Sequence, residues 1–489
     1  MARQLRILIV GGGIAGLATA YYARRLGEAA GRPVEVRLFE QSEHAGGKMI
    51  TLREGGFVIE GGPDSFITTK PWAIDLCREL GLSERLIPTN PNLRATYVLV
   101  GGRLQRLPAG LRLVAPTQWG PFLKSDLISW PGKLRMAMEF VWPARQEGGD
   151  ESVADFVRRR FGAEALERLG EPLMAGIYVA DPERLSLLST FPQFAALEHS
   201  HGSVVRGLRA EAARSKGEGA RVASLFMSLR GGTAELVEGL VASLGTQIVR
   251  TGRTVTAVEC PPRGGDEDGR RFSVRLEDGS AVDGDIVVLA TPAPVAGRLL
   301  AGDRGAPGVS TGLAELRNLS SATLSLGYRR SDVPHALDGY GFVVGARETV
   351  RILACTWSSS KLEGRAPHDA VLLRAFVGGH DKEADVALAD DALVAMVRSE
   401  LAGILGIRAA PMMTRIFRWY GANPQYDVGH RERMAALEAQ CPTGLYLVGG
   451  AYGGVGVPDC VRQALEAARR MTMPMVGEVS LLGEVSPAD

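Results

Sequence analysis

The chain has 489 residues, of which 45% are hydrophobic and 23% charged, and this composition excludes a disordered or collagen-like protein. Lys and Arg number 56 against 55 Asp and Glu, so the charge balance gives no sign of a nucleic-acid partner. Glycine is over-represented, because the chain holds 61 where the usual share of about 7% would give roughly 34. The surplus must serve backbone geometry, so its positions are informative.

The first predicted elements form a nucleotide-binding unit. A buried strand over residues 5–10 runs into Gly11-Gly12-Gly13-Ile14-Ala15-Gly16, a helix over 17–26 follows, and a second strand over 34–39 ends at Glu40 and Gln41. Gly11 permits the tight turn, Gly13 lets the backbone approach a pyrophosphate, and Gly16 lets helix and strand pack closely. The helix N-terminus faces the phosphates, and Glu40 accepts hydrogen bonds from ribose hydroxyls. This order predicts dinucleotide binding by residues 11–16, 40 and 41; the alternative is a glycine-rich turn in an α/β core.

Two further glycine turns follow the acidic residue. They are Gly46-Gly47-Lys48 and, after a strand, Gly61-Gly62-Pro63-Asp64-Ser65. Glycines let the chain run close beside an extended cofactor, and Lys48 supplies positive charge near a pyrophosphate or a flavin. We therefore predict that Gly47, Lys48 and residues 61–65 bind the cofactor, with a solvated loop lysine as the alternative for Lys48.

Residues 94–145 combine basic, aromatic and apolar side chains. They hold eight Lys or Arg against two acids, Asp126 and Glu139, and three of the six tryptophans, Trp119, Trp130 and Trp142. This mixture suits the headgroup layer of an anionic membrane. The alternative is an amphipathic helical domain that packs on its neighbour. No run of 18 apolar residues occurs, so no membrane-spanning helix is predicted.

Residues 230–300 return the chain to the nucleotide unit. Arg230-Gly231-Gly232 opens a helix, residues 247–249 and 254–258 read as strands, and Asp278-Gly279 indicates a hairpin. A buried strand over 285–290 ends at Ala290. The cofactor domain is therefore predicted to be discontinuous.

The C-terminal part repeats the pattern of strand, glycine turn and helix. A strand over 444–448 precedes Gly449 and Gly450, a glycine-rich turn follows to Val457, and residues 460–470 read as a helix. The N-terminus of this helix is placed to face the electron-rich end of a flavin ring. The alternative is a structural turn, and Asp459 is interpreted as a helix cap.

Cysteine and histidine give no sign of a metal or disulfide site. The five cysteines form no CxxC pair, so we interpret them as reduced thiols in a cytosol-facing protein. His199 and His201 lack further ligands nearby in sequence, so no metal site is predicted.

The glycine turns carry a family resemblance. Gly46-Gly47-Lys48 with the segment 55–66 resembles the flavin amine oxidase superfamily, which implies FAD rather than NAD. Segments 60–66, 130–135, 176–186, 228–232, 423–426 and 454–460 together resemble the oxygen-dependent, FAD-containing protoporphyrinogen oxidases of the bacterial type. The resemblance runs from about Arg6 to Met471, nearly the whole chain.

The resemblance implies an α/β (α+β) fold of three domains. The first is a Rossmann-like FAD-binding domain of the glutathione-reductase/p-hydroxybenzoate-hydroxylase type, over 1–72, 231–300 and 421–475. A mixed-sheet substrate domain takes 73–107, 207–230 and 301–420. A helical membrane-binding domain takes 108–206, and 476–489 form a tail.

The implied reaction is the six-electron oxidation of protoporphyrinogen IX to protoporphyrin IX. FAD takes hydride from the meso carbons in three rounds, and dioxygen reoxidises it with release of hydrogen peroxide. One alternative is oxidation of coproporphyrinogen III, which carries four carboxylates. Another is a flavin amine oxidase, although those enzymes usually have an acid where this chain has Gly450.

Site residues follow from the same resemblance. The backbone of Ala175 and Gly176 lies over the flavin and polarises a substrate N–H, Arg94 binds a propionate, and Val343 and Leu362 sandwich the ring. Further cofactor contacts are implied for Val255, Ala290, Trp419, Ala451, Val455, Gly456 and Val457. The alternatives are a surface arginine for Arg94 and ordinary core residues for Val343, Leu362 and Trp419.

The implied partners are a porphyrinogen, dioxygen, non-covalent FAD and a membrane surface. The resemblance further implies a cytoplasmic homodimer at the inner face of the cell membrane, with hand-over of product to a ferrochelatase.

Overall fold

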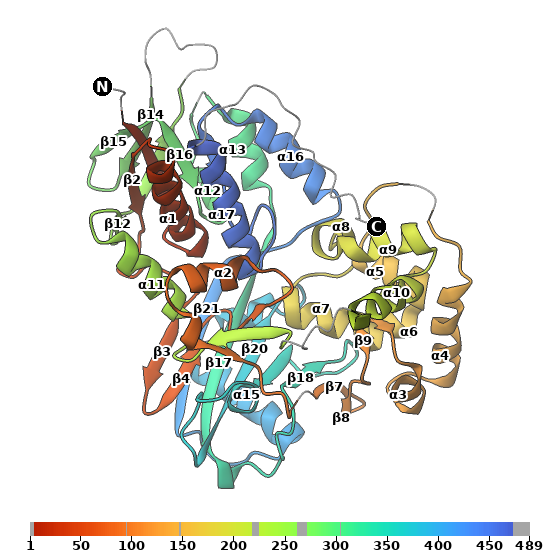
Figure 1. Cartoon of the computed structure of the whole chain (residues 1–489). Helices are drawn as coiled ribbons and strands as arrows, with labels where there is room; N and C mark the ends of the chain where they lie inside the picture. The colour runs from red at the N-terminus through yellow and green to blue at the C-terminus, as the bar shows by residue number, and fades with distance from the viewer. Residues whose placement is uncertain are drawn as a thin grey trace.

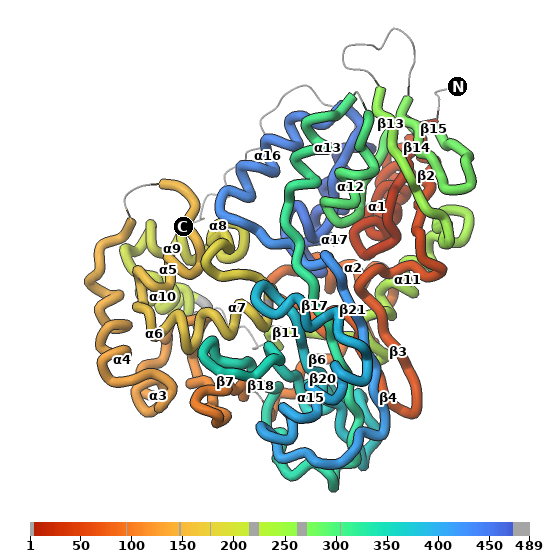
Figure 2. The backbone as a smooth tube through the Cα atoms, turned by 180° about the vertical axis from the view of Figure 1, so that it is seen from behind, coloured from red at the N-terminus to blue at the C-terminus, as the bar shows by residue number. Residues whose placement is uncertain are grey.

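The computed structural model describes residues 4–93, 95–145, 148–217, 224–261, 271–303 and 305–472. Figures 1 and 2 show three parts: a parallel sheet with flanking helices, a larger mixed sheet below it, and a group of helices beside both. The predicted tail 476–489 and the predicted propionate ligand Arg94 lie outside the described residues.

Chain segments that are far apart in sequence build the parallel sheet. Its strands lie in the order β12 (Val249–Arg250), β2 (Val34–Phe39), β1 (Leu5–Val10), β16 (Ile286–Leu289) and β22 (Leu445–Leu447), and all of them pair in parallel. Along β1, Ile7 and Ile9 pack on one side of the sheet and Leu8 and Val10 on the other. The strand is therefore buried on both faces, as its continuous apolar run predicted.

Helices cover both faces of this sheet. One face packs against α1 (Ile14–Ala29), α2 (Trp72–Glu79), α11 (Ala234–Leu244) and α17 (Val457–Thr472). The other packs against α12 (Ala293–Leu299), α13 (Pro307–Ala314), α16 (His430–Gln440) and a small antiparallel sheet of β13 (Val255–Glu259), β14 (Phe272–Leu276) and β15 (Ala281–Gly284). The predicted hairpin at Asp278-Gly279 is confirmed, because it joins β14 to β15.

The larger sheet is mixed. Its strands lie in the order β21 (Met413–Pro424), β17 (Asn318–Arg329), β20 (Ala370–Gly378), β19 (Ala354–Trp357), β18 (Gly341–Val344), β7 (Thr96–Val100) and β8 (Arg103–Arg106). β18 and β7 pair in parallel, and the other pairs are antiparallel. α15 (Asp390–Leu405) covers one face, whereas Val343 and Phe376 on the other face pack towards the helical part.

The helical part lies between residues 119 and 217. Its helices are α3 (Trp119–Lys124), α4 (Trp130–Ala137), α5 (Val153–Phe161), α6 (Ala163–Ala165), α7 (Glu171–Tyr178), α8 (Leu187–Thr190), α9 (Pro192–His201) and α10 (Val204–Gly217). Both views place α7 where the three parts meet (Figures 1 and 2). Within the described part of the chain, no helix combines the length and the apolar character that a membrane crossing needs.

Short elements complete the fold. They are β3 (Thr51–Glu54), β4 (Phe57–Glu60), β5 (Phe66–Ile67), β6 (Leu86–Pro88), β9 (Leu111–Arg112), β10 (Ala115–Pro116), β11 (Phe226–Leu229) and α14 (Ser358–Lys361). The predicted helix 17–26 begins earlier, at Ile14, and the predicted helix 460–470 begins at Val457. The domain boundaries inferred from the sequence remain predictions.

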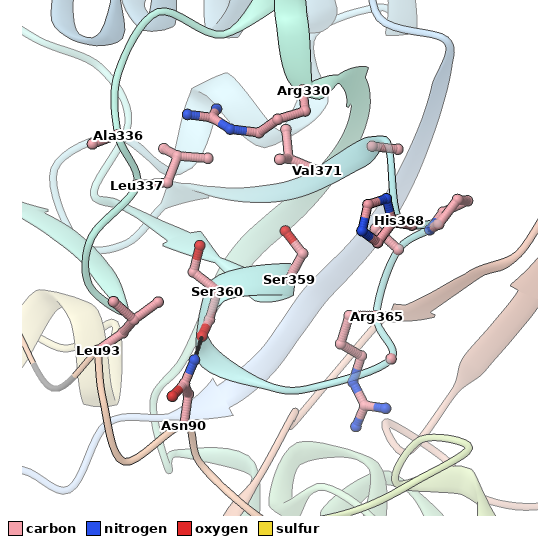
Figure 3. A pocket seen from close by; sticks show the side chains of 14 residues that line it. Asn90, Leu93, Arg330, Ala336, Leu337, Ser359, Ser360, Arg365, His368 and Val371 are labelled. Atoms are coloured by element: carbon pink, nitrogen blue, oxygen red, sulfur yellow. Dashed lines mark hydrogen bonds between the residues drawn. The ribbon is translucent and has the colours of Figure 1, made fainter.

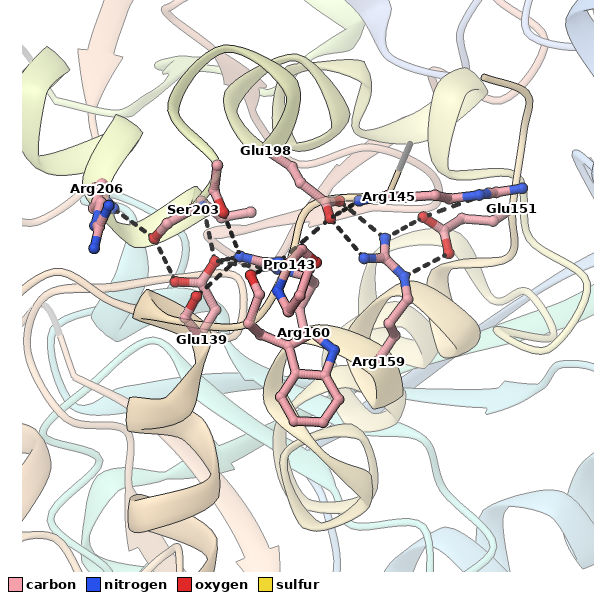
Figure 4. Close-up of polar contacts among 12 residues, drawn as sticks. Glu139, Pro143, Arg145, Glu151, Arg159, Arg160, Glu198, Ser203 and Arg206 are labelled. Carbon is pink, nitrogen blue, oxygen red and sulfur yellow. Dashed lines mark hydrogen bonds and ion pairs between the residues drawn. The ribbon is translucent and has the colours of Figure 1, made fainter. Parts of the chain in front are cut away.

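A buried ion pair fixes the helical part (Figure 4). Arg160 and Glu139 have no exposed side-chain surface, and Arg160 Nε lies 3.2 Å from Glu139 Oε1. Glu139 also accepts hydrogen bonds from Ser203 Oγ at 2.6 Å and from the Val204 N–H at 2.7 Å. The other N–H groups of Arg160 donate to backbone carbonyls, including that of Trp142. Full hydrogen bonding offsets the desolvation of both charges.

Candidate active site

The N-terminal glycine turn has the geometry of an anion cradle. A Cβ on Gly11, whose φ is +106°, would lie 2.7 Å from Ala290 O, and one on Gly16 would lie 2.0 Å from Gly11 O. A Cβ on Gly13 would meet nothing within 4 Å, so this residue borders open space. No side chain caps the N-terminus of α1. The free N–H groups of the first turn therefore fit a pyrophosphate. Ala290 packs against this turn at Gly11.

Glu40 closes this turn. Its Oε2 accepts a hydrogen bond from the Gly12 N–H at 2.7 Å, and its Oε1 accepts one from the Ser42 N–H at 2.9 Å. Each carboxylate oxygen has a second lone pair, so the predicted bond to a ribose hydroxyl remains available. Gln41, the next residue, is exposed beside it.

The second glycine turn joins the first directly. The Gly46 N–H donates to Gly12 O at 2.8 Å, and a Cβ on Gly47 would lie 3.2 Å from Gly13 Cα. Lys48 is not a solvated loop lysine, because its Nζ donates to Ala422 O. Burial lowers the pKa of Lys48 from its ordinary value. The Nζ group therefore lies beside the end of β21, and its role near phosphate or flavin is still a prediction.

Side chains of the mixed sheet hold the third glycine turn. Trp419 Nε1 donates to Gly61 O at 3.0 Å, Thr323 Oγ1 donates to the same oxygen at 3.1 Å, and Arg374 Nη2 donates to Gly62 O at 2.5 Å. A Cβ on Gly62 would lie 1.8 Å from Lys48 O, so no other residue fits there. The indole N–H of Trp419 thus serves the turn, and any contact with the cofactor is still a prediction. Pro63 O accepts a hydrogen bond from Thr233 Oγ1 at 2.9 Å.

Asp64 and Ser65 are committed to Lys361. Lys361 Nζ lies 2.8 Å from both carboxylate oxygens of Asp64 and 3.1 Å from Ser65 Oγ. Burial raises the pKa of Asp64, but Lys361 and Arg374 outweigh it and hold this pKa below its usual range. Lys361 and Arg374 were not predicted as part of the site, although an arginine inside the apolar run of β20 is a signal of a buried partner.

The C-terminal glycine turn adjoins the N-terminal one. Gly449 has φ +127°, and a Cβ on it would lie 3.6 Å from Ala15 Cβ. Gly454 has φ +125°, and Val455 is exposed. Ala451 and Val457 are buried, and their contacts with the cofactor are still predictions. Lys70 Nζ binds Asp459 Oδ1 at 2.7 Å in the first turn of α17.

α7 meets β18 at the predicted catalytic segment. A Cβ on Gly176 would lie 2.9 Å from Val343 Cγ1, so the structure brings these two predicted residues together. Ala175 O accepts a hydrogen bond from the Val179 N–H at 3.2 Å at the end of α7. Leu362 is fully buried at the end of α14, beside Lys361, and Val255 is half-buried in β13.

Cys460 and Tyr178 are unsuited to act as a base. Burial raises the pKa of Cys460 to about 12, and it raises that of Tyr178, two residues after Gly176 in α7, to about 12. Both groups therefore stay protonated at neutral pH. Among the described residues, no three His, Cys, Asp or Glu side chains are grouped to hold a metal ion, and all five cysteines are free.

A separate cavity of about 310 Å³ lies beside α14 (Figure 3). The hydroxyls of Ser359 and Ser360 point into it towards Arg330, whereas the Arg365 guanidinium points away. Arg365 donates instead to Ser228 Oγ at 2.9 Å and Arg230 O at 2.9 Å. Among the predicted site residues that the structure describes, none lines this cavity.

Comparison with known proteins decides the family. Residues 14–472 match the model of the flavin containing amine oxidoreductases. The chain belongs to this family. The cofactor prediction is confirmed, because members contain flavin and the glycine turns fit FAD.

Family members of known name are similar along nearly the whole chain. Coproporphyrinogen III oxidase of Bacillus subtilis (strain 168) is 36% identical over 466 residues, which cover 94% of this chain and 96% of the relative. Protoporphyrinogen oxidase of Bos taurus is 29% identical over 95% of this chain and 98% of its own. A solved structure from Exiguobacterium sp. 255-15, described as a candidate protoporphyrinogen oxidase, has TM-score 0.82 and 34% identity over 96% of this chain and 99% of its own. The resemblance to porphyrinogen oxidases is thus confirmed.

More distant family structures show the fold alone. Putrescine oxidase bound to putrescine has TM-score 0.68 and 18% identity over 96% of this chain and 99% of its own. The FAD-binding part and the mixed sheet of the predicted fold class are confirmed. Membrane association of the helical part remains a prediction.

Proposed function

We propose that the protein is a FAD-dependent porphyrinogen oxidase of heme biosynthesis. It removes six electrons from a porphyrinogen in three steps, with dioxygen as acceptor and hydrogen peroxide as product. The observation that carries this proposal is the 36% identity to the B. subtilis enzyme over 94% of the chain. Gly450, where amine oxidases usually have an acid, weakens the amine oxidase alternative.

When bound, FAD supplies the hydride acceptor and the reaction with dioxygen. The chain's own residues bind and orient. The last carbonyls of α7 carry the partial negative charge of a helix C-terminus, which attracts the pyrrole N–H groups of a porphyrinogen. Ala175 O accepts a hydrogen bond from the Val179 N–H and keeps one lone pair free for a substrate N–H. Val343 fills the space next to Gly176 and excludes water there.

Coproporphyrinogen III is the substrate that we favour. Seven relatives between 31% and 36% identical are named coproporphyrinogen III oxidase. Protoporphyrinogen IX, the substrate first expected, is the second candidate, because the bovine relative at 29% identity is named for it. Arg94 remains the proposed propionate ligand, and Leu362 a proposed wall of the ring site.

The test supplies each porphyrinogen to the purified, FAD-loaded protein. Porphyrin fluorescence and oxygen consumption are followed together, and kcat/KM is compared between the two substrates. A higher kcat/KM for coproporphyrinogen III is expected. No fluorescence gain with either substrate would overturn the proposal, whereas a higher value for protoporphyrinogen IX would reverse only the substrate preference.

We also propose that α3 and α4 dock on an anionic lipid surface. Six large hydrophobic side chains are exposed between residues 123 and 142, and they are Leu123, Trp130, Leu134, Met138, Val141 and Trp142. Lys133 Nζ lies 4.5 Å from the centre of the Trp130 ring, and the Arg135 guanidinium lies 4.7 Å from that of Trp142. Aromatic rings beside cations suit the headgroup layer. Trp119 takes no part, because it packs inward on Phe122 and Phe140.

The remaining proposals concern the setting of the reaction. We place the protein in the cytoplasm at the inner face of the cell membrane, as a homodimer that binds FAD non-covalently. Hand-over of product to a ferrochelatase follows from the proposed place in heme biosynthesis.

A further inference from the structure

Two adjacent buried residues connect α7 to the C-terminal glycine turn. Gln425 and Tyr426 follow the end of β21 and are 3% and 2% exposed. The residue two positions before Gln425 is anchored to the sheet, because Asn423 Nδ2 donates to Ser321 Oγ at 2.9 Å. The segment runs antiparallel to residues 185–186, with Leu185 paired to Asp427 and the Ser186 N–H donating to Tyr426 O at 2.7 Å.

Gln425 holds the chain that leaves α7. Its Oε1 accepts a hydrogen bond from the Asp181 N–H at 2.9 Å, and its Nε2 donates to Asp181 O at 3.2 Å. Both ends of the amide thus bind the backbone of one residue, which fixes the direction of the chain there. Val179, a β-branched residue at φ +60°, lies between Gly176 and Asp181. Such a conformation persists only when its surroundings impose it.

Tyr426 holds the glycine turn. Its hydroxyl donates to Gly450 O and accepts a hydrogen bond from the Gly454 N–H at 3.1 Å, so one oxygen bridges both ends of residues 450–454. Its ring stacks on His430, with 4.2 Å between ring centres and 21° between planes. Burial raises the pKa of Tyr426 well above its ordinary value, so the hydroxyl keeps its proton for the Gly450 bond.

We infer that Gln425 and Tyr426 set the separation between the end of α7 and the C-terminal glycine turn. Adjacent residues of an extended segment direct their side chains to opposite sides, so one reaches α7 and the other the turn. The inference rests on the proposed function, in which the last carbonyls of α7 face the porphyrinogen and the glycine turns hold FAD. Hydride transfer needs reacting atoms about 3–3.5 Å apart, and a misplacement of about 1 Å costs on the order of a hundredfold in rate. Gln425 and Tyr426 are therefore positioning residues.

The test uses Tyr426→Phe, which removes only the hydroxyl, and Gln425→Met, which keeps the side-chain length without hydrogen bonds. Tyr420→Phe is the matched control, since Tyr420 is 62% exposed in β21, the strand that precedes Gln425 and Tyr426. Each FAD-loaded protein is measured for flavin visible circular dichroism, for the flavin reduction rate at saturating porphyrinogen, for KM and for Tm.

We expect Tyr426→Phe and Gln425→Met each to lower the flavin reduction rate at least about tenfold, with a KM within about twofold of the wild-type value. Tyr426→Phe should also alter the flavin circular dichroism, and Gln425→Met should not, because it acts on α7. If Gln425→Met does not fold, Gln425→Glu keeps the acceptor for the Asp181 N–H but loses the donor to Asp181 O, and it should still lower the flavin reduction rate. Wild-type rates and spectra in both variants would overturn the inference, as would rate losses that Tyr420→Phe reproduces.

The failure of the proposed function gives a different result. Wild-type protein would then bind FAD and oxidise no porphyrinogen. In that case Tyr426→Phe still tests the position of the turn through the flavin spectrum, and an unchanged spectrum would overturn that part of the inference.

Discussion

Gly176 lies near the C-terminal end of α7, and a methyl group added there would lie 2.9 Å from Val343 Cγ1. Packing this tight leaves no room for a side chain without displacement of Val343 or of the α7 backbone. Gly403 in α15 is the opposite case, because a Cβ there would meet nothing within 4 Å. The same residue type is thus a steric requirement at one helix and a neutral choice at another.

Gly176→Leu is expected to abolish turnover while FAD stays bound. The added side chain would displace Val343 or the α7 backbone, whose last carbonyls are proposed to face the substrate. A fall in kcat/KM of at least about a hundredfold is expected, with the FAD-to-protein ratio of the wild type. Gly403→Leu, the matched control, should keep wild-type activity. Normal turnover by Gly176→Leu would contradict the assignment of this segment.

His430 gives the protein a pH-dependent stability. Burial and the nearby Arg433 lower the pKa of His430 to about 4, below its ordinary value of 6.5. The unfolded chain binds this proton more readily than the folded one between these values, so stability is lost as pH falls from about 6.5 towards 4. The loss is on the order of 3 kcal/mol at full effect.

His430→Phe keeps a ring against Tyr426 and removes the titration. The drop in Tm between pH 6.5 and 4.5, at constant FAD, should therefore be smaller for this variant than for the wild type. Equal drops would show that His430 titrates normally in the folded state.

The glycine turns could be predicted from the sequence because their function is local. Positive φ at Gly11 and Gly449 and the close approach at Gly16 follow from strand, turn and helix alone. The partners of Arg374 could not be predicted, because it reaches Gly61 and Gly62 across more than 300 residues of sequence. Glu40 was predicted to bind the ribose, and its hydrogen bonds from the Gly12 and Ser42 N–H groups were not predicted.

The helical part has a buried ion pair in its interior and exposed apolar side chains on α4. Glu139 and Arg160 are buried between α5 and the start of α10, and Arg159 extends the network to Glu198 and Glu151 near the surface (Figure 4). Loss of either buried partner would leave an uncompensated charge. α4, just before this network, exposes Trp130 and Leu134 at 69% each. The basic, aromatic and apolar composition of this segment is visible in the sequence. The exposure of Trp130 and Trp142 could not be predicted from it, because it depends on tertiary packing, as does the inward position of Trp119.

The double variant Trp130→Ser and Leu134→Ser is expected to weaken lipid binding. Each change removes apolar surface from the proposed contact, and each should lower partition to phosphatidylglycerol vesicles at least about fivefold at low salt. Liposome flotation measures this. Met412→Ser with Val428→Ser is the matched control, because these exposed residues lie elsewhere, and it should float like the wild type. A wild-type protein that does not float at low salt would contradict lipid docking.

At the scale of the molecule, three distant stretches close one cofactor site. β1 and β2 come from the N-terminus, β12 and β16 from the middle, and β22 from the C-terminal part of the chain. The repeated strand and glycine patterns in the sequence predicted this discontinuity. The mixed sheet was predicted only through resemblance, because the pairing of β18 with β7 joins segments more than 200 residues apart.

FAD removal is expected to destabilise the whole fold. A ligand that binds only the folded state at about 1,000 times its Kd contributes about 4 kcal/mol. Apoprotein should therefore melt several degrees below the FAD-loaded protein, and added FAD should restore both Tm and yellow colour. Acid precipitation should leave the flavin in the supernatant, since binding is proposed to be non-covalent. Flavin retained in the pellet would contradict this.

The edge strand β22 and the turn after it, contributed by residues 445–457, have a consequence for synthesis. A ribosome releases the chain from its N-terminus onwards, so Gly11 to Gly16 leave it long before Gly449 and Gly454. The nascent protein must hold its first glycine turn open without the strand that completes the sheet. A chain that stops before residue 445 lacks both this strand and this turn, so it should bind FAD more weakly than the full chain.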